Sequence, residues 1–481
     1  MNGVLILVIL LGYFGLLMLI SALVGKQKGN DGFFTANKKS PWYVVSIGMI
    51  GTSISGITFV SVPGMVRDNG FLYMQTVFGF FFGYILIAKV LLPIYYRLDA
   101  PSIYVYLKDR FGNRAYKTGA WFFLISKGIA ASIRVYVAAL ILHEVLFKGW
   151  NVPFAVTVVT LILMIWLYTY RGGLKTIIWA DLLQSLCMLG ALVLIVFQLG
   201  KAIDQDAVGI LKSISSSKYF HLVEWSDWGS KQHFLKQFIS GIFIALVMTG
   251  LDQGMIQKNR SIKKLNEAQR NMYWYGFAFI PVNFIFLTLG TLMYIFAAQK
   301  GIVLPQSSDK VLPMLATQGY LNTTVTVLFM LGIVSAAFSS ADTSMTAMTT
   351  SFCVDILEKE ADEKSRKRVH LMMAGIFVLI IFIFRATNST SLIDAIYIMV
   401  SYTYGPLLGL YTFGLFTKKR ANDRLIPIIA LSSPIVCYLL QFFSNRFFGY
   451  HFGYELLMLN GLFTFTGLWV TSLKKQQYGN F

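Results

Sequence analysis

The chain has 481 residues, of which 56% are hydrophobic and only 13% are charged, and its formal net charge is +19. A soluble protein of this length would carry about a quarter charged residues, so the composition excludes a soluble globular protein and indicates a membrane protein. The basic excess could indicate a nucleic-acid partner, but its distribution along the chain argues for membrane topology instead.

Apolar runs long enough to cross a bilayer recur from end to end. They predict thirteen spans, at residues 3–24, 41–66, 70–96, 117–147, 152–170, 174–199, 236–259, 272–299, 322–357, 366–386, 392–418, 423–441 and 453–473. The fold class is therefore an all-α polytopic membrane protein. The first run is too long for a signal-peptide core and lacks a basic start, so we expect a retained helix.

Lysine and arginine alternate in density between successive loops. When alternate loops, with the span ends beside them, are assigned to opposite sides, twenty-seven of the 41 basic residues fall on one side and eleven on the other. The remaining three, Lys89, Lys127 and Arg134, lie in the interior of spans. This asymmetry is the positive-inside pattern. It predicts a multi-pass protein of the cell (inner) membrane, with the N-terminus outside and the C-terminus in the cytoplasm, and no nucleic-acid partner.

The second span contains the sequence GTSISG, Gly51 to Gly56, near its middle, followed by Pro63-Gly64. Glycine costs about 1 kcal/mol relative to alanine inside a helix, so this segment favours local unwinding. One interpretation is a kink or a close helix contact, which small residues also permit. The other is a discontinuous helix whose freed carbonyl groups bind an ion.

Ionisable residues inside three later spans need a partner or a cavity, because a charge at the centre of a bilayer costs about 2.5–3.5 kcal/mol on insertion scales. Arg134 lies in the fourth span, within AASIRVYVAAL, and Asp181 lies in the sixth. Asp342 lies in the ninth, at the centre of the hydroxyl-rich stretch Ser335 to Ser351. This pattern indicates a protein that holds a small cation within the bilayer, and therefore transport.

Spans two to six and seven to eleven form two sets of five. Because five is odd, the second set starts from the opposite side of the membrane, as an inverted repeat requires. Gly241 and Gly250 in the seventh span resemble, more weakly, the glycines at the break in the second span. The expected domains are an N-terminal helix and loop, a first repeat, an extracellular loop, a second repeat, and two C-terminal helices with a tail, at residues 1–40, 41–199, 200–235, 236–422 and 423–481.

No motif indicates an enzyme. The three cysteines fall in spans, the five histidines lack zinc spacing, and there is no phosphate loop or recognisable Ser/His/Asp set.

Several motifs, taken together and in order, resemble the sodium:solute symporter family. They are RGGLKTIIWADLLQ (171–184), DQGMIQK (252–258, with Lys258 in place of the family's arginine), AAFSSADTS followed by Asp355, and GPLLGLYTFGLFTKKRAN (405–422). The resemblance runs from about residue 40 to 422. It implies a LeuT-type five-plus-five inverted repeat with one extra helix before the core and two after it, which agrees with thirteen spans.

The resemblance implies a primary sodium site between the broken second span and the ninth. Its oxygen ligands would be the backbone carbonyls of Gly51, Ile54 and Ala336 and the hydroxyls of Ser339 and Ser340. A simpler reading is that the two serines bond to carbonyl groups one turn back in their own helix.

The resemblance also implies a second cation locus at Asp181, Asp342 and Thr343, although the family members with such a site carry serine at the position of Asp342. Two carboxylates could bind a cation or share a proton. Alternatively, Asp342 could pair with Arg134 or Lys127.

For the solute, the resemblance to sialic-acid transporters of this family implies a pocket formed by Arg134, Ser53, Ser55 and Thr58, with Gln75 as a further polar residue. Guanidinium binds carboxylate through two parallel hydrogen bonds. The alternative role for Arg134 is an ion pair with Asp342. Ala245 and Met248 stand where sugar transporters carry an asparagine and a gating tyrosine, which argues against a galactose- or glucose-type site.

We therefore expect a secondary symporter that imports a small organic solute with a carboxylate, such as sialic acid or another sugar acid, and that uses sodium as the coupling ion. Its partners would be the solute, sodium and the lipid bilayer, with no obligatory protein partner evident. The alternatives are a sodium/neutral sugar or amino-acid symporter of the same fold, and a transporter-derived membrane sensor. The sensor would normally carry a signalling domain, whereas this chain stops soon after Lys475.

Overall fold

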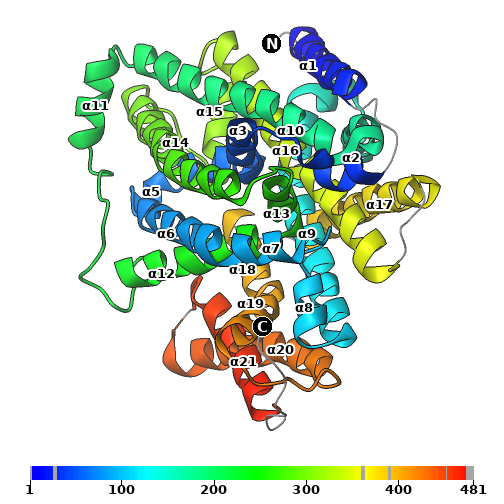
Figure 1. Ribbon diagram of the computed structural model, residues 1–481. Coiled ribbons are helices and arrows are strands. Elements are labelled where there is room, and N and C mark those ends of the chain that lie inside the picture. Colours follow the sequence, from blue (N-terminus) through cyan, green and yellow to red (C-terminus); the bar gives the residue numbers. More distant parts are fainter. Residues whose placement is uncertain (1–2, 25–29, 359–362, 388–391, 451, 473–481) are drawn as a thin grey trace.

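The computed structural model describes residues 3–24, 30–358, 363–387, 392–450 and 452–472. The regular elements in these ranges are helices (Figure 1). The first half of the chain forms α1 (Gly3–Val24), α2 (Asn30–Thr35), α3 (Trp42–Ser53), α4 (Gly56–Gly64), α5 (Val66–Asn69), α6 (Tyr73–Leu86), α7 (Leu92–Leu98), α8 (Val105–Arg110), α9 (Asn113–Leu142), α10 (Phe154–Ala202) and α11 (Ala207–Ser215). The second half forms α12 (Phe234–Ala245), α13 (Gln253–Arg260), α14 (Leu265–Gln299), α15 (Val311–Thr317), α16 (Thr323–Ser351), α17 (Glu363–Thr387), α18 (Leu392–Thr403), α19 (Gly405–Phe416), α20 (Ile426–Phe448) and α21 (Leu456–Val470).

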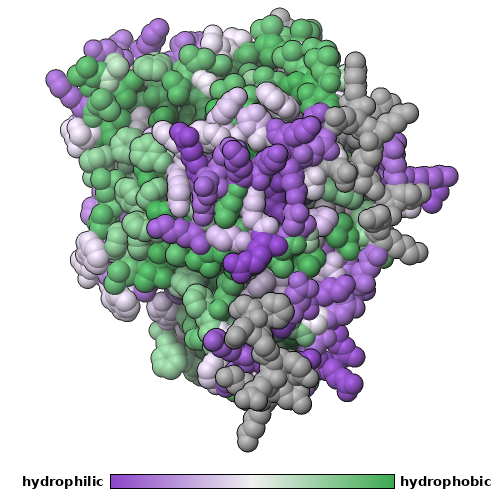
Figure 2. Space-filling view, viewed as in Figure 1, coloured by the Kyte–Doolittle hydropathy of each residue, from purple (hydrophilic) through white to green (hydrophobic). Residues whose placement is uncertain are grey.

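The longer helices overlap the thirteen predicted spans, and short helices such as α2 and α8 lie in the segments that connect them. Within the described ranges, eight helices are long and apolar enough to cross a membrane, and two bent pairs meet the same criterion when each pair is taken as one span. Three shorter apolar helical segments lie in the remaining predicted spans. On the face in Figure 2, hydrophilic residues gather at the centre and extend to the right-hand edge, and apolar residues cover much of the left side and the top.

The long helix α10 contains two of the predicted spans, 152–170 and 174–199. They are separated at Gly173, whose φ of 50° and ψ of −134° are not helical. A Cβ atom at this position would lie 2.3 Å from the Phe33 ring, so both the dihedral angles and the space require glycine.

The predicted break in GTSISG is confirmed. Helix α3 ends at Ser53, and the two halves of the span are bent by 61°. Ile54 has extended dihedral angles, and Ser55 begins α4 as its N-cap by accepting a hydrogen bond from the Thr58 N–H. The chain therefore leaves helical geometry for two residues in the middle of the bundle.

A second break lies between α12 and α13, which are bent by 66° around Leu251 and Asp252. Asp252 caps α13 by accepting from the Met255 N–H at 3.0 Å. Gly250 lies directly before this break, but Gly241 does not take part in it. Gly241 lies inside α12 where that helix crosses α6, and a Cβ atom there would be 2.3 Å from the Thr76 carbonyl oxygen. The interpretation of Gly241 as part of the break was therefore wrong, because its role is close helix packing.

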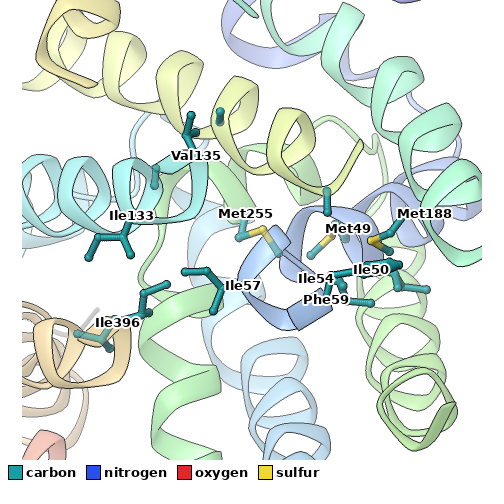
Figure 3. Packing of buried hydrophobic residues seen from close by; sticks show 14 of the residues in the cluster. Met49, Ile50, Ile54, Ile57, Phe59, Ile133, Val135, Met188, Met255 and Ile396 are labelled. Atoms are coloured by element: carbon teal, nitrogen blue, oxygen red, sulfur yellow. The ribbon is translucent and has the colours of Figure 1, made fainter. Parts of the chain in front are cut away.

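The two broken spans meet in the interior. Helices α3, α10, α13 and α16 lie near the centre of the view in Figure 1, whereas α1 and α11 lie at its edge. Helix α16 packs against α10, α3, α4 and α13, and α13 also packs against α3. Figure 3 shows the buried apolar side chains of Met49, Ile54 and Met255 around the first break. The polar groups described next are therefore enclosed by hydrocarbon.

Candidate functional site

The C-terminal end of α3 lies in a buried cluster of oxygen atoms. Thr52 Oγ1 lies 3.1 Å from Ser339 Oγ and 3.2 Å from Asp181 Oδ1. The Ser339 hydroxyl donates to the same carboxylate oxygen at 2.5 Å. Three helices, α3, α10 and α16, thus bring two hydroxyls and a carboxylate to one point beside the first break.

Lys258 of α13 reaches into this cluster from the second break. Its ammonium lies 2.6 Å from Asp181 Oδ2 and donates to Thr52 Oγ1 at 2.5 Å. The side chain is only 1% exposed, so this is a fully buried ion pair. Sequence reasoning noted Lys258 only as a replacement for arginine. The sequence already showed that Lys258 lies at the end of a predicted span. A lysine there needs a buried partner, as Asp181 does.

The two helices that carry the positions implied for the primary sodium site, α3 and α16, pack against each other. Ser340 donates a 3.2 Å hydrogen bond to the Thr52 carbonyl oxygen, across from α16 to the end of α3. Ser339, Ser340 and Ala336 are all buried on α16. Ile54 lies at the break itself, and Gly51 is one turn earlier, with its N–H donating to Ser185 Oγ at 3.1 Å. The simpler reading of serines bonded only within their own helix does not describe Ser339 and Ser340, whose hydroxyls reach α10 and α3.

Asp342 has different partners from those considered in the sequence. Its carboxylate accepts from the Tyr168 hydroxyl at 2.6 Å and from the Thr343 hydroxyl at 3.2 Å. Lys127 instead forms an ion pair with Asp252, with its nitrogen 2.8 Å from Oδ2. Within the described residues, no ion pair joins Asp342 to Arg134 or Lys127, so the alternative that Asp342 pairs with either of them was wrong. Arg134 and Lys127 on α9 do not reach Asp342, because they face a different part of the interior.

A cavity lies on the other side of the first break. Four of the residues predicted for the solute pocket line it: Ser53, Ser55, Thr58 and Arg134. Tyr73, Tyr84, Tyr275, Tyr397 and Tyr404 supply an aromatic, hydroxyl-bearing wall, and Lys127 and Asp252 are also part of the lining. Ser53 Oγ lies 2.5 Å from the Tyr275 hydroxyl. Apolar rings with a few convergent polar groups are typical of a small-molecule site.

Arg134 differs from the other charged residues of this cavity. Its Nε is buried without a hydrogen-bond partner, and the ion pairs of the described residues do not include its guanidinium. Lys127 and Asp252 neutralise each other, and the Tyr404 hydroxyl also donates to Asp252 at 3.0 Å. The lining therefore carries one uncompensated positive charge.

Gln75 does not line this cavity. Its side chain is 0% exposed, and its amide donates to the Gln232 carbonyl at 2.9 Å and accepts from the Glu224 N–H at 3.0 Å. Gln75 therefore holds the loop that precedes α12, and its place in the predicted pocket was wrong because its helix presents another face to the cavity. Ala245 and Met248, by contrast, do line the cavity.

Comparison with known proteins extends these observations. The sodium:solute symporter family model matches residues 33–424. The chain is 23% identical over 439 residues to the sodium/sialic acid symporter SiaT of Proteus mirabilis, covering 88% of this chain and 86% of that protein. It is 24% identical over 444 residues to the sodium/glucose cotransporter of Vibrio parahaemolyticus, covering 86% of this chain and 80% of that protein.

Solved structures agree on the architecture. A substrate-bound, outward-open Na⁺-coupled sialic acid symporter superposes with a TM-score of 0.82 at 19% identity, covering 97% of each chain. Mhp1, a nucleobase-cation-symport-1 family transporter, superposes with a TM-score of 0.60 at 13% identity, covering 92% of this chain and 94% of that one. These likenesses show the fold, a LeuT-type inverted repeat.

The match of the family model to most of the chain and the shared fold lead to one conclusion. The chain belongs to the sodium:solute symporter family, and it is a multi-pass membrane protein that couples solute transport to sodium rather than an enzyme.

Proposed function

We propose that this chain imports a small organic solute that carries a carboxylate, and that Arg134 binds that carboxylate. The observation that carries the proposal is the guanidinium of Arg134, which lines the central cavity without an anionic partner among the described residues. A buried unpaired charge is costly, and a carboxylate would offset that cost through two charge-assisted hydrogen bonds. Ser53, Ser55 and Thr58 would supply further hydroxyl contacts.

The coupling ion would bind on the opposite side of the same break. The carbonyl groups of Gly51, Ile54 and Ala336 and the hydroxyls of Ser339 and Ser340 form a neutral oxygen set of the kind that unwound membrane helices offer to sodium. The inter-helix hydrogen bond from Ser340 to the Thr52 carbonyl supports this assignment, because it brings α16 and the end of α3 within coordinating distance.

Both proposed sites share the segment around residues 51–58. The Thr52 carbonyl accepts the hydrogen bond from Ser340, and Thr52, Ser53 and Ser55 line the cavity. Sodium that fixes the conformation of this segment would also fix the hydroxyls that contact the solute. Such a shared element provides a coupling free energy between the two ligands, and the coupling must be reciprocal.

Several relatives have anionic cargo in their names: the sialic acid symporters of Proteus mirabilis and Aliivibrio fischeri, the human sodium/iodide cotransporter and the mouse sodium-coupled monocarboxylate transporter 1. The similar sodium/glucose cotransporter of Vibrio parahaemolyticus has a neutral sugar in its name, so the choice of an acid here rests on Arg134 in the cavity. Sialic acid or another sugar acid fits the combination of Arg134 with three hydroxyl residues.

We further propose that the protein lies in the inner membrane with its N-terminus outside and its C-terminus in the cytoplasm. The distribution of lysine and arginine supports this orientation. The surrounding bilayer would be its environment, without an obligatory protein partner.

The test is uptake into proteoliposomes containing the purified protein, with an inward sodium gradient or with choline in its place. N-acetylneuraminate, its methyl ester, glucuronate, pyruvate and galactose would each compete with a labelled acid. We expect inhibition by at least one free acid in sodium only, with the ester at least about tenfold weaker, since each 1.4 kcal/mol is a factor of ten. Equal inhibition by galactose or by the ester would contradict the proposal.

A further inference from the structure

The oxygen cluster beside Asp181 already contains a cation that belongs to the protein. The ammonium of Lys258 contacts Asp181 Oδ2 at 2.6 Å and Thr52 Oγ1 at 2.5 Å. Asp181 Oδ2 accepts no hydrogen bond of good geometry from another described residue, so the lysine is its main partner. An ammonium with its three donors therefore occupies the position where these oxygens would otherwise attract an external cation.

The second break places the Lys258 ammonium beside the first break. Helix α13 begins at the Asp252 N-cap, is only 8 residues long and packs against both α3 and α16. Lys258 lies in its last turn and is 1% exposed. Its position is therefore defined by packing on all sides rather than by a mobile surface side chain.

Formal charges in the cluster also argue against an additional ion. Asp342 interacts electrostatically with both Asp181 and Lys258, and its carboxylate is already hydrogen-bonded to Tyr168 and Thr343. The Asp181 carboxylate and the Lys258 ammonium neutralise each other. A second sodium beside Asp181 would therefore find no uncompensated carboxylate there, and the neighbouring ammonium would repel it.

We propose that Lys258 is a tethered cation that takes the place of a second sodium at Asp181, so that this symporter couples one sodium ion to each solute molecule. The inference rests on the proposed function for the primary sodium site. Under this proposal, no second cation binds at Asp181, Asp342 and Thr343. The Lys258 side chain sets the number of sodium ions that are coupled to each solute molecule.

The test counts bound sodium ions. Radioactive ²²Na⁺ binding to the purified full-length protein, at constant ionic strength with choline, should saturate at one ion per chain in the wild type. In Lys258→Ala, which leaves the Asp181 carboxylate without its cation, a second ion should bind, and the Hill coefficient for sodium activation of uptake should rise from about one towards two. Lys258→Arg, which keeps the charge, is the matched control and should stay at one ion.

The double variant Asp181→Asn/Lys258→Ala removes both charges and should return to one ion. Two ions bound to the wild type, or one ion in Lys258→Ala with the carboxylate intact, would overturn the inference. If Lys258→Ala does not fold, the count on the wild type decides. Failure of the proposed function has a different signature, since the wild type would then bind no sodium or Ser340→Ala would bind it normally.

Discussion

The hydroxyl of Ser340 lies 3.2 Å from the carbonyl oxygen of Thr52, the next-to-last residue of α3. This contact joins a helix of the second repeat to the point where a helix of the first repeat loses its regular geometry. Oxygen atoms from the two repeats can surround one ion only while these helices keep this separation. At the proposed sodium site, a relative movement of α16 and α3 would therefore release the ion and so couple alternating access to sodium.

Ser340→Ala removes one hydroxyl oxygen of the proposed sodium site without changing the helix. We expect about a tenfold higher sodium concentration for half-maximal uptake, because a lost polar contact is worth roughly 1–1.5 kcal/mol. Solute affinity at saturating sodium should change little. Ser344→Ala is a suitable control, because the Ser344 hydroxyl bonds to the Ser340 carbonyl within the same helix. A wild-type sodium dependence in Ser340→Ala proteoliposomes would disprove the assignment.

Arg134→Lys keeps the positive charge of the cavity but loses the planar fork that binds both carboxylate oxygens. Solute binding should weaken at least about tenfold, since a charge-assisted hydrogen bond is worth roughly 1.5–3 kcal/mol. Isothermal titration with the acid identified in the uptake assay would measure the change. Normal binding by this variant, with the ester binding as tightly as the acid, would make Arg134 a structural residue.

Asp181→Asn leaves the Lys258 ammonium buried without an anion, which should cost roughly 3–5 kcal/mol of stability. Asp181→Asn/Lys258→Met should recover most of that loss, because both charges are then absent. Thermal unfolding in detergent measures both variants. Asp99→Asn is the control for an exposed pair: the hydrogen bond from Lys38 lowers the pKa of Asp99, but its side chain is 64% exposed, so the effect should stay below about 1 kcal/mol. If Asp181→Asn and Asp99→Asn lose the same amount of stability, the buried ion pair of Asp181 and Lys258 is not a strong one.

Lys127→Met frees the Asp252 carboxylate from its 2.8 Å partner within the same cavity that contains Arg134. The freed carboxylate should then compete with the solute for Arg134, so affinity for the acid should fall. Lys127→Met/Asp252→Asn removes that competitor and should regain affinity, although both variants lose the same lysine. Binding that falls equally in the single and the double variant would show instead that Lys127 contacts the solute directly.

Local patterns in the sequence were enough to predict the spans and the first break. A hydrophobic run of sufficient length needs no tertiary information to indicate a membrane helix, and GTSISG disfavours a regular helix by its own composition. Arg134, Asp181 and Asp342 could be singled out because a charge within a span always requires an explanation. The assignments that failed each depended on which face of a helix meets which neighbour. They are the role of Gly241 in the second break, the place of Gln75 in the pocket, and the pairing of Asp342 with Arg134 or Lys127.

The sequence by itself therefore determined the apolar segments that become helices, the position of the first break and the residues that cannot face lipid. Only the tertiary structure decided the partners of those residues. Lys258 and Asp181 are 77 positions apart, and Ser340 and Thr52 are 288 apart. Hydropathy and helix propensity depend on residues within a few turns of one another. A contact between distant segments depends instead on how two bent helices pack, which local sequence patterns do not reveal.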